Sequence, residues 1–212
     1  MIKNKILILS PHTDDAELGC GGAIAKFVEE KKDILWYAFS TAEDSLPQGC
    51  HKDTLRNEFI DVCNQLKLNE NHYIIDNYAV RKLPNYRQEI LEKLVSVKND
   101  FKPDLVIGPS LNDFHQDHQV IANEMVRAFK SSSSIISYEL PWNHIDFSTQ
   151  MFIPCKKEHI LKKLEILSCY KSQVEKQREY FSKDFILGLA KTRGIQINSK
   201  FAEAFEVIRW IE

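Results

Sequence analysis

The stretch Lys5-Ile6-Leu7-Ile8-Leu9-Ser10-Pro11-His12-Thr13-Asp14-Asp15 joins a short apolar run to a polar turn. A continuous apolar run that ends at Ser-Pro is typical of a central strand in a parallel sheet, because such a strand is covered on both faces. A helical pattern over residues 19–31 follows it. The stretch therefore predicts a strand-then-helix unit with His12, Asp14 and Asp15 beyond the end of the strand.

The same order repeats through the first two thirds of the chain. Further strands are predicted at 34–39, 73–75, 104–108 and 135–139, and further helices at 54–66, 87–97 and 117–129. This alternation favours an α/β fold, a Rossmann-like three-layer α/β/α sandwich with a mostly parallel sheet. The C-terminal portion reads as helical over 156–170, 173–181 and 184–193, with a closing strand over 205–211. No Gly/Ser-rich linker interrupts the chain, so residues 1–212 are predicted to form a single domain.

Composition excludes several classes of protein. The 212 residues are 43% hydrophobic and 27% charged, which is ordinary for a globular protein. The net charge of −2 offers no basic surface for nucleic acid. No apolar run approaches the ~20 residues of a membrane span, and the start of the chain lacks the features of a signal peptide. A cytoplasmic location is therefore expected. The five cysteines are scattered without a CxxC motif, so they are expected to be free thiols.

The turn after the first strand carries the ligands of a metal site. His12 and Asp15 are three residues apart in a loop, so both can bend toward one ion, which leaves Asp14 free to face a water. Zinc lowers the pKa of a bound water to about 7, and a neighbouring carboxylate can then accept its proton as general base. The alternative is structural, because Asp is also a common N-cap of a helix.

A second polar cluster, His115-Gln116-Asp117-His118, follows the strand at 104–108. Ligands of parallel sheets bind beyond the carboxyl ends of the strands, so the two clusters are expected to be neighbours. His118 could complete a three-ligand zinc site with an open fourth position. His115 could stabilise an oxyanion and protonate a leaving amine, with Asp117 or Asp113 orienting it. An exposed helix start is the alternative reading of an isolated HxxH.

Taken together, these clusters resemble the LmbE-like (PIG-L) superfamily of zinc-dependent N-acetyl deacetylases. The matching segments are Pro11-His12-Thr13-Asp14-Asp15-Ala16-Glu17-Leu18-Gly19-Cys20-Gly21-Gly22, His115-Gln116-Asp117-His118, Arg193-Gly194 and Phe201-Ala202-Glu203-Ala204-Phe205. Two departures stand out: Thr13 replaces the usual Pro, and Ala16 stands where many members carry Glu.

The resemblance implies roles for individual residues. It implies that His12, Asp15 and His118 hold zinc, that Asp14 is the general base, and that His115 is the acid or oxyanion stabiliser with Asp117 as its partner. No motif marks the candidate substrate contacts. They are chosen because they follow a predicted strand or open a predicted helix: Arg56, Arg81, Trp142 and His144. The aromatic ring of Trp142, with polar neighbours, would suit stacking on a sugar.

The sequence thus favours a hydrolase that removes an acetyl group from an N-acetylated amino sugar or sugar conjugate, with water activated by Zn²⁺. Mixed His/Asp ligation also accepts Fe²⁺ or Mn²⁺. The alternatives are a zinc amidase acting on a non-sugar conjugate and a non-catalytic metal- or ligand-binding module. The expected partner is a small molecule. Self-association into a homo-oligomer stays open.

Overall fold

The computed structural model describes residues 3–212, in which seven strands form one sheet. The strands are β1 (Lys5–His12), β2 (Asp33–Ser40), β3 (Tyr73–Ile75), β4 (Leu105–Gly108), β5 (Ser134–Tyr138), β6 (Met151–Cys155) and β7 (Phe201–Arg209). Their order across the sheet is β3-β2-β1-β4-β5-β7-β6. Strands β1 to β5 pair in parallel, and β7 runs antiparallel to both β5 and β6. The predicted mostly parallel α/β fold is confirmed.

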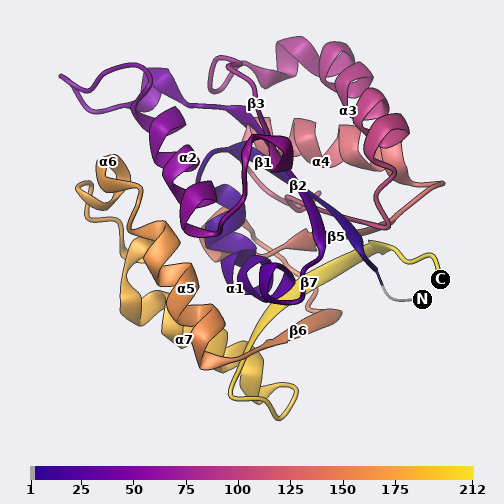
Figure 1. The fold of residues 1–212 in the computed structure, drawn as a ribbon, viewed down its shortest axis with the longest axis vertical. Helices are drawn as coiled ribbons and strands as arrows, with labels where there is room; N and C mark the ends of the chain where they lie inside the picture. The colour runs from indigo at the N-terminus through magenta and orange to yellow at the C-terminus, as the bar shows by residue number, and fades with distance from the viewer. Residues whose placement is uncertain (1–2) are drawn as a thin grey trace.

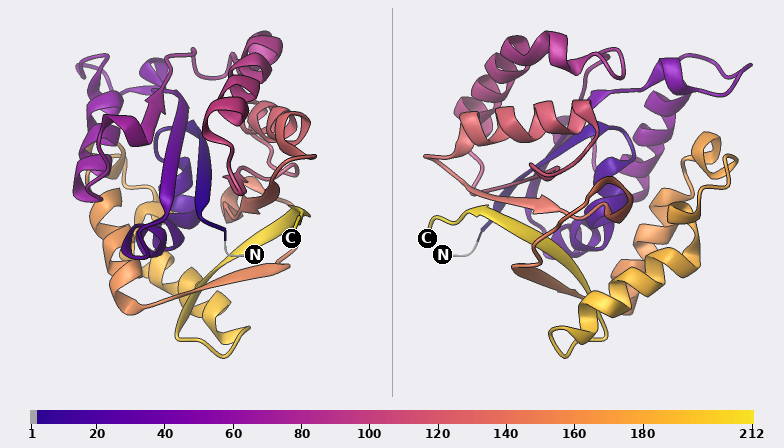
Figure 2. Two further views of the ribbon diagram at one scale, coloured as in Figure 1. Left: turned by 45° about the vertical axis from the view of Figure 1, so that its right-hand side comes forward. Right: turned by 180° about the vertical axis from the view of Figure 1, so that it is seen from behind.

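Helices cover both faces of this sheet (Figures 1 and 2). The helices are α1 (Asp15–Glu29), α2 (Thr54–Gln65), α3 (Arg87–Phe101), α4 (Gln116–Phe129), α5 (Lys157–Leu167), α6 (Lys171–Val174) and α7 (Lys183–Ile195). One core cluster joins the sheet to α3 and α4, and the other joins it to α1, α2, α5 and α7. None of the helices formed by residues 3–212 combines the length and the apolar character that crossing a bilayer requires.

Strand β1 explains this three-layer arrangement. Ile6 and Ile8 belong to the cluster under α1, whereas Leu7 and Leu9 belong to the cluster under α3 and α4. Successive side chains of a strand point to opposite faces, so a run without polar residues needs a helix layer on each side. The unbroken apolar run at the start of the chain therefore determines that β1 lies in the centre of the sheet.

The C-terminal third differs from its prediction in three places. The helix expected over 173–181 is replaced by the short α6 and a 3-10 turn at Glu179–Phe181, because Gln177 adopts a left-handed φ of 51° that no helix continues. Strand β6 was not predicted. Its Pro154 lacks an N–H and disfavours an interior strand, but β6 lies at the sheet edge, where proline is tolerated. Strand β7 begins at Phe201 rather than at residue 205.

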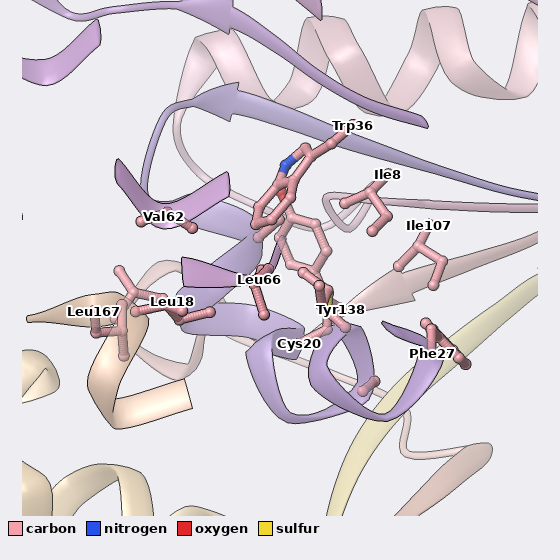
Figure 3. Packing of buried hydrophobic residues seen from close by; sticks show 14 of the residues in the cluster. Ile8, Leu18, Cys20, Phe27, Trp36, Val62, Leu66, Ile107, Tyr138 and Leu167 are labelled. Carbon is pink, nitrogen blue, oxygen red and sulfur yellow. The ribbon is translucent and has the colours of Figure 1, made fainter. Parts of the chain in front are cut away.

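A close contact fixes the start of α1 against the sheet. Tyr138 of β5 is fully buried beside α1 (Figure 3), and its hydroxyl donates to the carbonyl oxygen of Leu9 at 3.2 Å. A Cβ atom on Gly19 would lie 2.4 Å from Cδ2 of Tyr138, so only glycine permits this approach. The next residue, Cys20, has a non-helical φ of −145° and kinks the helix.

Substituting Gly19 should therefore destabilise the fold. In Gly19→Ala the added methyl group overlaps the Tyr138 ring, and overpacking of this kind costs about 1–3 kcal/mol. Gly188→Ala in α7 is the matched control, because a Cβ there meets nothing within 4 Å and alanine favours a helix by about 1 kcal/mol. Urea unfolding measures both changes. Equal stability of the two variants would contradict the packing described.

Candidate metal centre

Three elements bring the predicted ligands to one edge of the sheet. His12 is the last residue of β1, Asp15 is the first residue of α1, and His118 lies in the first turn of α4. Strands β1 and β4 are paired neighbours in parallel register, with Ile8 opposite Ile107. Because their carboxyl ends lie side by side, the loop after β1 meets the loop after β4, although the two are about a hundred residues apart in the chain.

The ligand atoms of these residues converge. Oδ2 of Asp15 lies 3.1 Å from Nδ1 of His12 and 3.1 Å from Nε2 of His118, and the two nitrogens are 3.3 Å apart. Ligands at about 2.0–2.1 Å from a tetrahedral zinc are about 3.3 Å from one another. All three residues are buried. Both the spacing and the donor types of the site therefore fit a single zinc ion.

In both His12 and His118, the second ring nitrogen contacts an aspartate carboxylate. Nε2 of His12 is 3.0 Å from Oδ2 of Asp117, and Nδ1 of His118 is 2.7 Å from Oδ2 of Asp113. Partners of this kind fix the orientation and tautomer of metal-binding imidazoles. This differs from the predicted pairing of Asp117 with His115. The Asp117 side chain turns to His12 and to the N–H of Leu83, and only its backbone N–H contacts His115.

The charges in the cluster favour a cation. Burial alone would lower the pKa of His12, but Asp15 and Asp117 raise it to about 9. Burial likewise opposes charge on His118, whose pKa Asp15 and Asp113 raise to about 10. The two imidazoles hold the pKa of Asp15 below its usual range despite burial. A divalent ion would supply the positive charge that protons otherwise bring, and its binding would release those protons.

His115 stands beside this cluster as a neutral donor. Burial and the two neighbouring imidazoles lower its pKa to about 4. Its Nδ1 accepts the N–H of Asp117 at 3.2 Å, so the proton of the neutral ring is on Nε2. Nε2–H of this ring can then donate a hydrogen bond into the pocket. Nitrogens of His12, His115 and His118 lie within 4.8 Å of one another, which makes an all-histidine set the alternative to Asp15 ligation.

Asp14 is free for chemistry. It occupies the N-cap position of α1, yet its side chain makes no capping hydrogen bond, which removes the structural reading of this residue. Burial and the neighbouring charge of Asp15 raise its pKa to about 6. A carboxylate with this pKa is mostly ionised at neutral pH and is more basic than an exposed aspartate. It can therefore accept a proton from a water in the pocket.

A pocket of about 310 Å³ contains this site. It is lined by His12, Thr13, Asp14, Asp15, Leu18, Ala42, Ser45, Leu55, Val80, His115, His118, Trp142, Asn143, Gln173, Lys176, Arg178 and Tyr180. The volume is at the lower end of the range for small-molecule sites.

Of the predicted substrate contacts, the structure brings only Trp142 to this pocket, stacked on Tyr180 with ring centroids 4.1 Å apart. Arg56 and Arg81 are exposed and outside the lining, and Nε2 of His144 instead accepts the N–H of Leu140 at 2.9 Å. Glu17 does not take the place of the missing acid at Ala16, because its carboxyl contacts Tyr170 away from the pocket.

The C-terminal segment supplies a wall of the pocket that the sequence did not predict. Gln173, Lys176, Arg178 and Tyr180 all line the pocket. No motif marks them, and the helix predicted over this segment would have placed Arg178 on a different face from Gln173, Lys176 and Tyr180. Their position depends on the turn at Gln177, which the local pattern does not indicate.

Known proteins are similar to this chain both in sequence and in structure. Over 182 residues the chain is 26% identical to the uncharacterized deacetylase YaiS of Escherichia coli K12, covering 79% of this chain and 90% of that protein. The structure is similar to N,N'-diacetylchitobiose deacetylase from Pyrococcus horikoshii, with a TM-score of 0.77 and 17% identity over 97% of this chain and 84% of that one. It is also similar to GalB, the 4-carboxy-2-hydroxymuconate hydratase of Pseudomonas putida KT2440, with a TM-score of 0.76 and 18% identity over 99% of this chain and 98% of that one.

At such identities the two solved structures support the fold alone. The sequence match to a family is more specific, since the model of the PIG-L family, described as GlcNAc-PI de-N-acetylase, matches residues 7–129. That range includes both polar clusters and all three converging ligands. The chain belongs to the PIG-L family of de-N-acetylases.

Proposed function

We propose that this protein is a zinc-dependent hydrolase that removes the acetyl group from an N-acetylated amino sugar or sugar conjugate. The observation that carries the proposal is the convergence of His12, Asp15 and His118 in a pocket that also contains Asp14 and the N–H of His115. A site for binding alone would need neither a free carboxylate nor a free donor. Family membership supports the same reaction.

The residues divide the reaction between them. Bound zinc would supply Lewis acidity toward a water and a carbonyl oxygen. Asp14 accepts a proton from the attacking water, whose oxygen forms a bond to the amide carbon. Nε2–H of His115 donates to the carbonyl oxygen as negative charge develops on it. When the C–N bond breaks, Asp14 returns its proton to the amine nitrogen, so the products are acetate and the free amine.

The alternatives differ from this proposal in what an assay would detect. A zinc amidase for a non-sugar conjugate would bind zinc and be silent on every N-acetyl sugar. A binding module would hold metal without any turnover. The similarity to a hydratase supports the fold only and brings no second activity to this chain. A cytoplasmic location and a single domain stay predictions from the sequence.

Loss of one ligand should abolish both zinc binding and activity. His118→Ala removes a ligand atom and leaves Asp15 without one of its two imidazole partners. His51→Ala changes an exposed histidine that is not part of the pocket lining and is the control. Metal analysis should find about one zinc per chain in the wild type and control and none in His118→Ala. Amine release from a panel of N-acetyl sugars should follow the zinc content. Unchanged zinc content in His118→Ala would contradict the site.

Loss of the Asp14 carboxylate should lower kcat without changing the zinc content. Asp14→Asn keeps the shape of the side chain and removes its ability to accept a proton. General-base catalysis contributes about 10²–10⁴-fold, so kcat should fall by about that factor. Zinc content should stay at the wild-type level. Asp61→Asn, on an exposed position of α2, is the matched control. A near-normal kcat in Asp14→Asn would remove Asp14 from the role of base.

The carboxylate behind His118 should tune the affinity for zinc. Asp113→Asn keeps an oxygen near Nδ1 of His118 but removes the negative charge. Loss of such a partner commonly costs about 10–100-fold in metal affinity. Competition with a chromophoric chelator measures the Kd of zinc, and Asp100→Asn on the exposed end of α3 serves as control. Equal zinc affinity in the two variants would show that the His118–Asp113 pair has no effect on the metal.

A further inference from the structure

Two cations in the pocket wall, Lys176 and Arg178, donate their hydrogen bonds to neutral groups. Nζ of Lys176 donates to the carbonyl oxygen of Ser45 and to Oε1 of Gln173, both at 3.0 Å. Nη1 of Arg178 donates to the hydroxyl of Tyr180 at 2.6 Å. Among residues 3–212, neither cation forms an ion pair with a carboxylate. Neutral acceptors therefore orient both side chains, and the carboxylate of Asp14 acts on both cations only through space.

The charges of Lys176 and Arg178 oppose each other. Burial and the charge of Arg178 lower the pKa of Lys176. Asp14 and Glu58 act in the opposite direction through space, but Glu58 already accepts hydrogen bonds from the backbone N–H and the hydroxyl of Ser172. An anion bound between Lys176 and Arg178 would relieve the repulsion of the two like charges.

Arg178 is held where it can make directed hydrogen bonds. Its partner Tyr180 stacks on Trp142 at an interplanar angle of 10°, and Trp142 also contacts the ring of Phe185 edge-on. The aromatic stack fixes the hydroxyl that Arg178 contacts, so less side-chain freedom is lost when an anion binds. A guanidinium matches the geometry of phosphate and carboxylate groups, and a lysine adds a point charge.

The position of the cations within the pocket points to a part of the substrate that does not react. The acetamide must reach Asp14 and the converging ligands. Lys176 and Arg178 lie in the same pocket of about 310 Å³, which is large enough for a small molecule that reaches both. We propose that the pocket selects N-acetylated amino sugars that carry an anionic substituent, a phosphate or a carboxylate, and that Lys176 and Arg178 bind this group. The inference rests on the proposed deacetylase function.

The test compares three derivatives of N-acetylglucosamine that carry a phosphate, a carboxylate or an uncharged group at the same position. The zinc-loaded enzyme is assayed for amine release from N-acetylglucosamine 1-phosphate, the carboxymethyl glycoside of N-acetylglucosamine and the neutral methyl glycoside. We expect kcat/KM to be about 10–100-fold higher for an anionic substrate than for the neutral one, because charge-assisted hydrogen bonds are the stronger ones. The difference should shrink as ionic strength rises. The better of the two anionic substrates identifies phosphate or carboxylate as the group selected.

A double variant assigns the preference to these residues. In Lys176→Gln/Arg178→Gln the ratio of kcat/KM between anionic and neutral substrates should fall to about one, mainly through KM of the anionic substrate. Lys171→Gln/Lys183→Gln makes the same change of charge at exposed positions outside the pocket and should keep the wild-type ratio. Circular dichroism and zinc content show whether each variant is folded and loaded.

The outcomes separate this inference from the function on which it rests. Equal turnover of neutral and anionic glycosides by the wild type would overturn the anion preference and leave the deacetylase in place. A preference that survives in Lys176→Gln/Arg178→Gln would overturn the assignment to these two residues. No amine release from any of the three glycosides by the zinc-loaded wild type would overturn the proposed function itself.

Discussion

The convergence of two imidazoles on one carboxylate oxygen is the interaction on which the rest of this structure depends. Oδ2 of Asp15 lies 3.1 Å from a nitrogen of His12 and 3.1 Å from a nitrogen of His118. The contact requires the ends of β1 and β4 to be neighbours, which the parallel pairing of these strands provides. It also requires burial, because these charges would be worth little to one another in water. The sheet, its order and its two helix layers therefore all support one small polar cluster.

A surrounding layer holds that cluster in place. Asp117 and Asp113 fix the outer nitrogens of the two histidines. The C-terminal part of the chain contributes through Tyr170, whose hydroxyl contacts the carbonyl oxygen of Thr13 and the carboxyl of Glu17. Burial raises the pKa of the Glu17 carboxyl well above its usual value. The segment that follows Tyr170 then completes the pocket with Lys176 and Arg178.

Much of this could be predicted from the sequence because the relevant signals are local. The apolar run before His12 indicates a central strand, and the spacing of His12, Asp15 and His118 indicates a shared metal. The partner of Asp117 could not be predicted, since an aspartate beside two histidines at a helix start can turn to several groups, and only the packed positions of His12 and Leu83 decide its direction. Arg56 and Arg81 are close in sequence to Leu55 and Val80, which do line the pocket, but their own side chains are exposed. Position near a strand end or a helix start does not determine the direction of a side chain.

Diffraction from crystals grown with zinc, recorded above and below the zinc absorption edge, would locate the metal directly. We expect one strong anomalous peak per chain, about 2.0–2.2 Å from Nδ1 of His12, Oδ2 of Asp15 and Nε2 of His118, with a fourth position facing the pocket. A peak held by the three imidazoles of His12, His115 and His118 without Asp15 would contradict the ligand set. Zinc bound only elsewhere on the chain would contradict the metal centre as a whole.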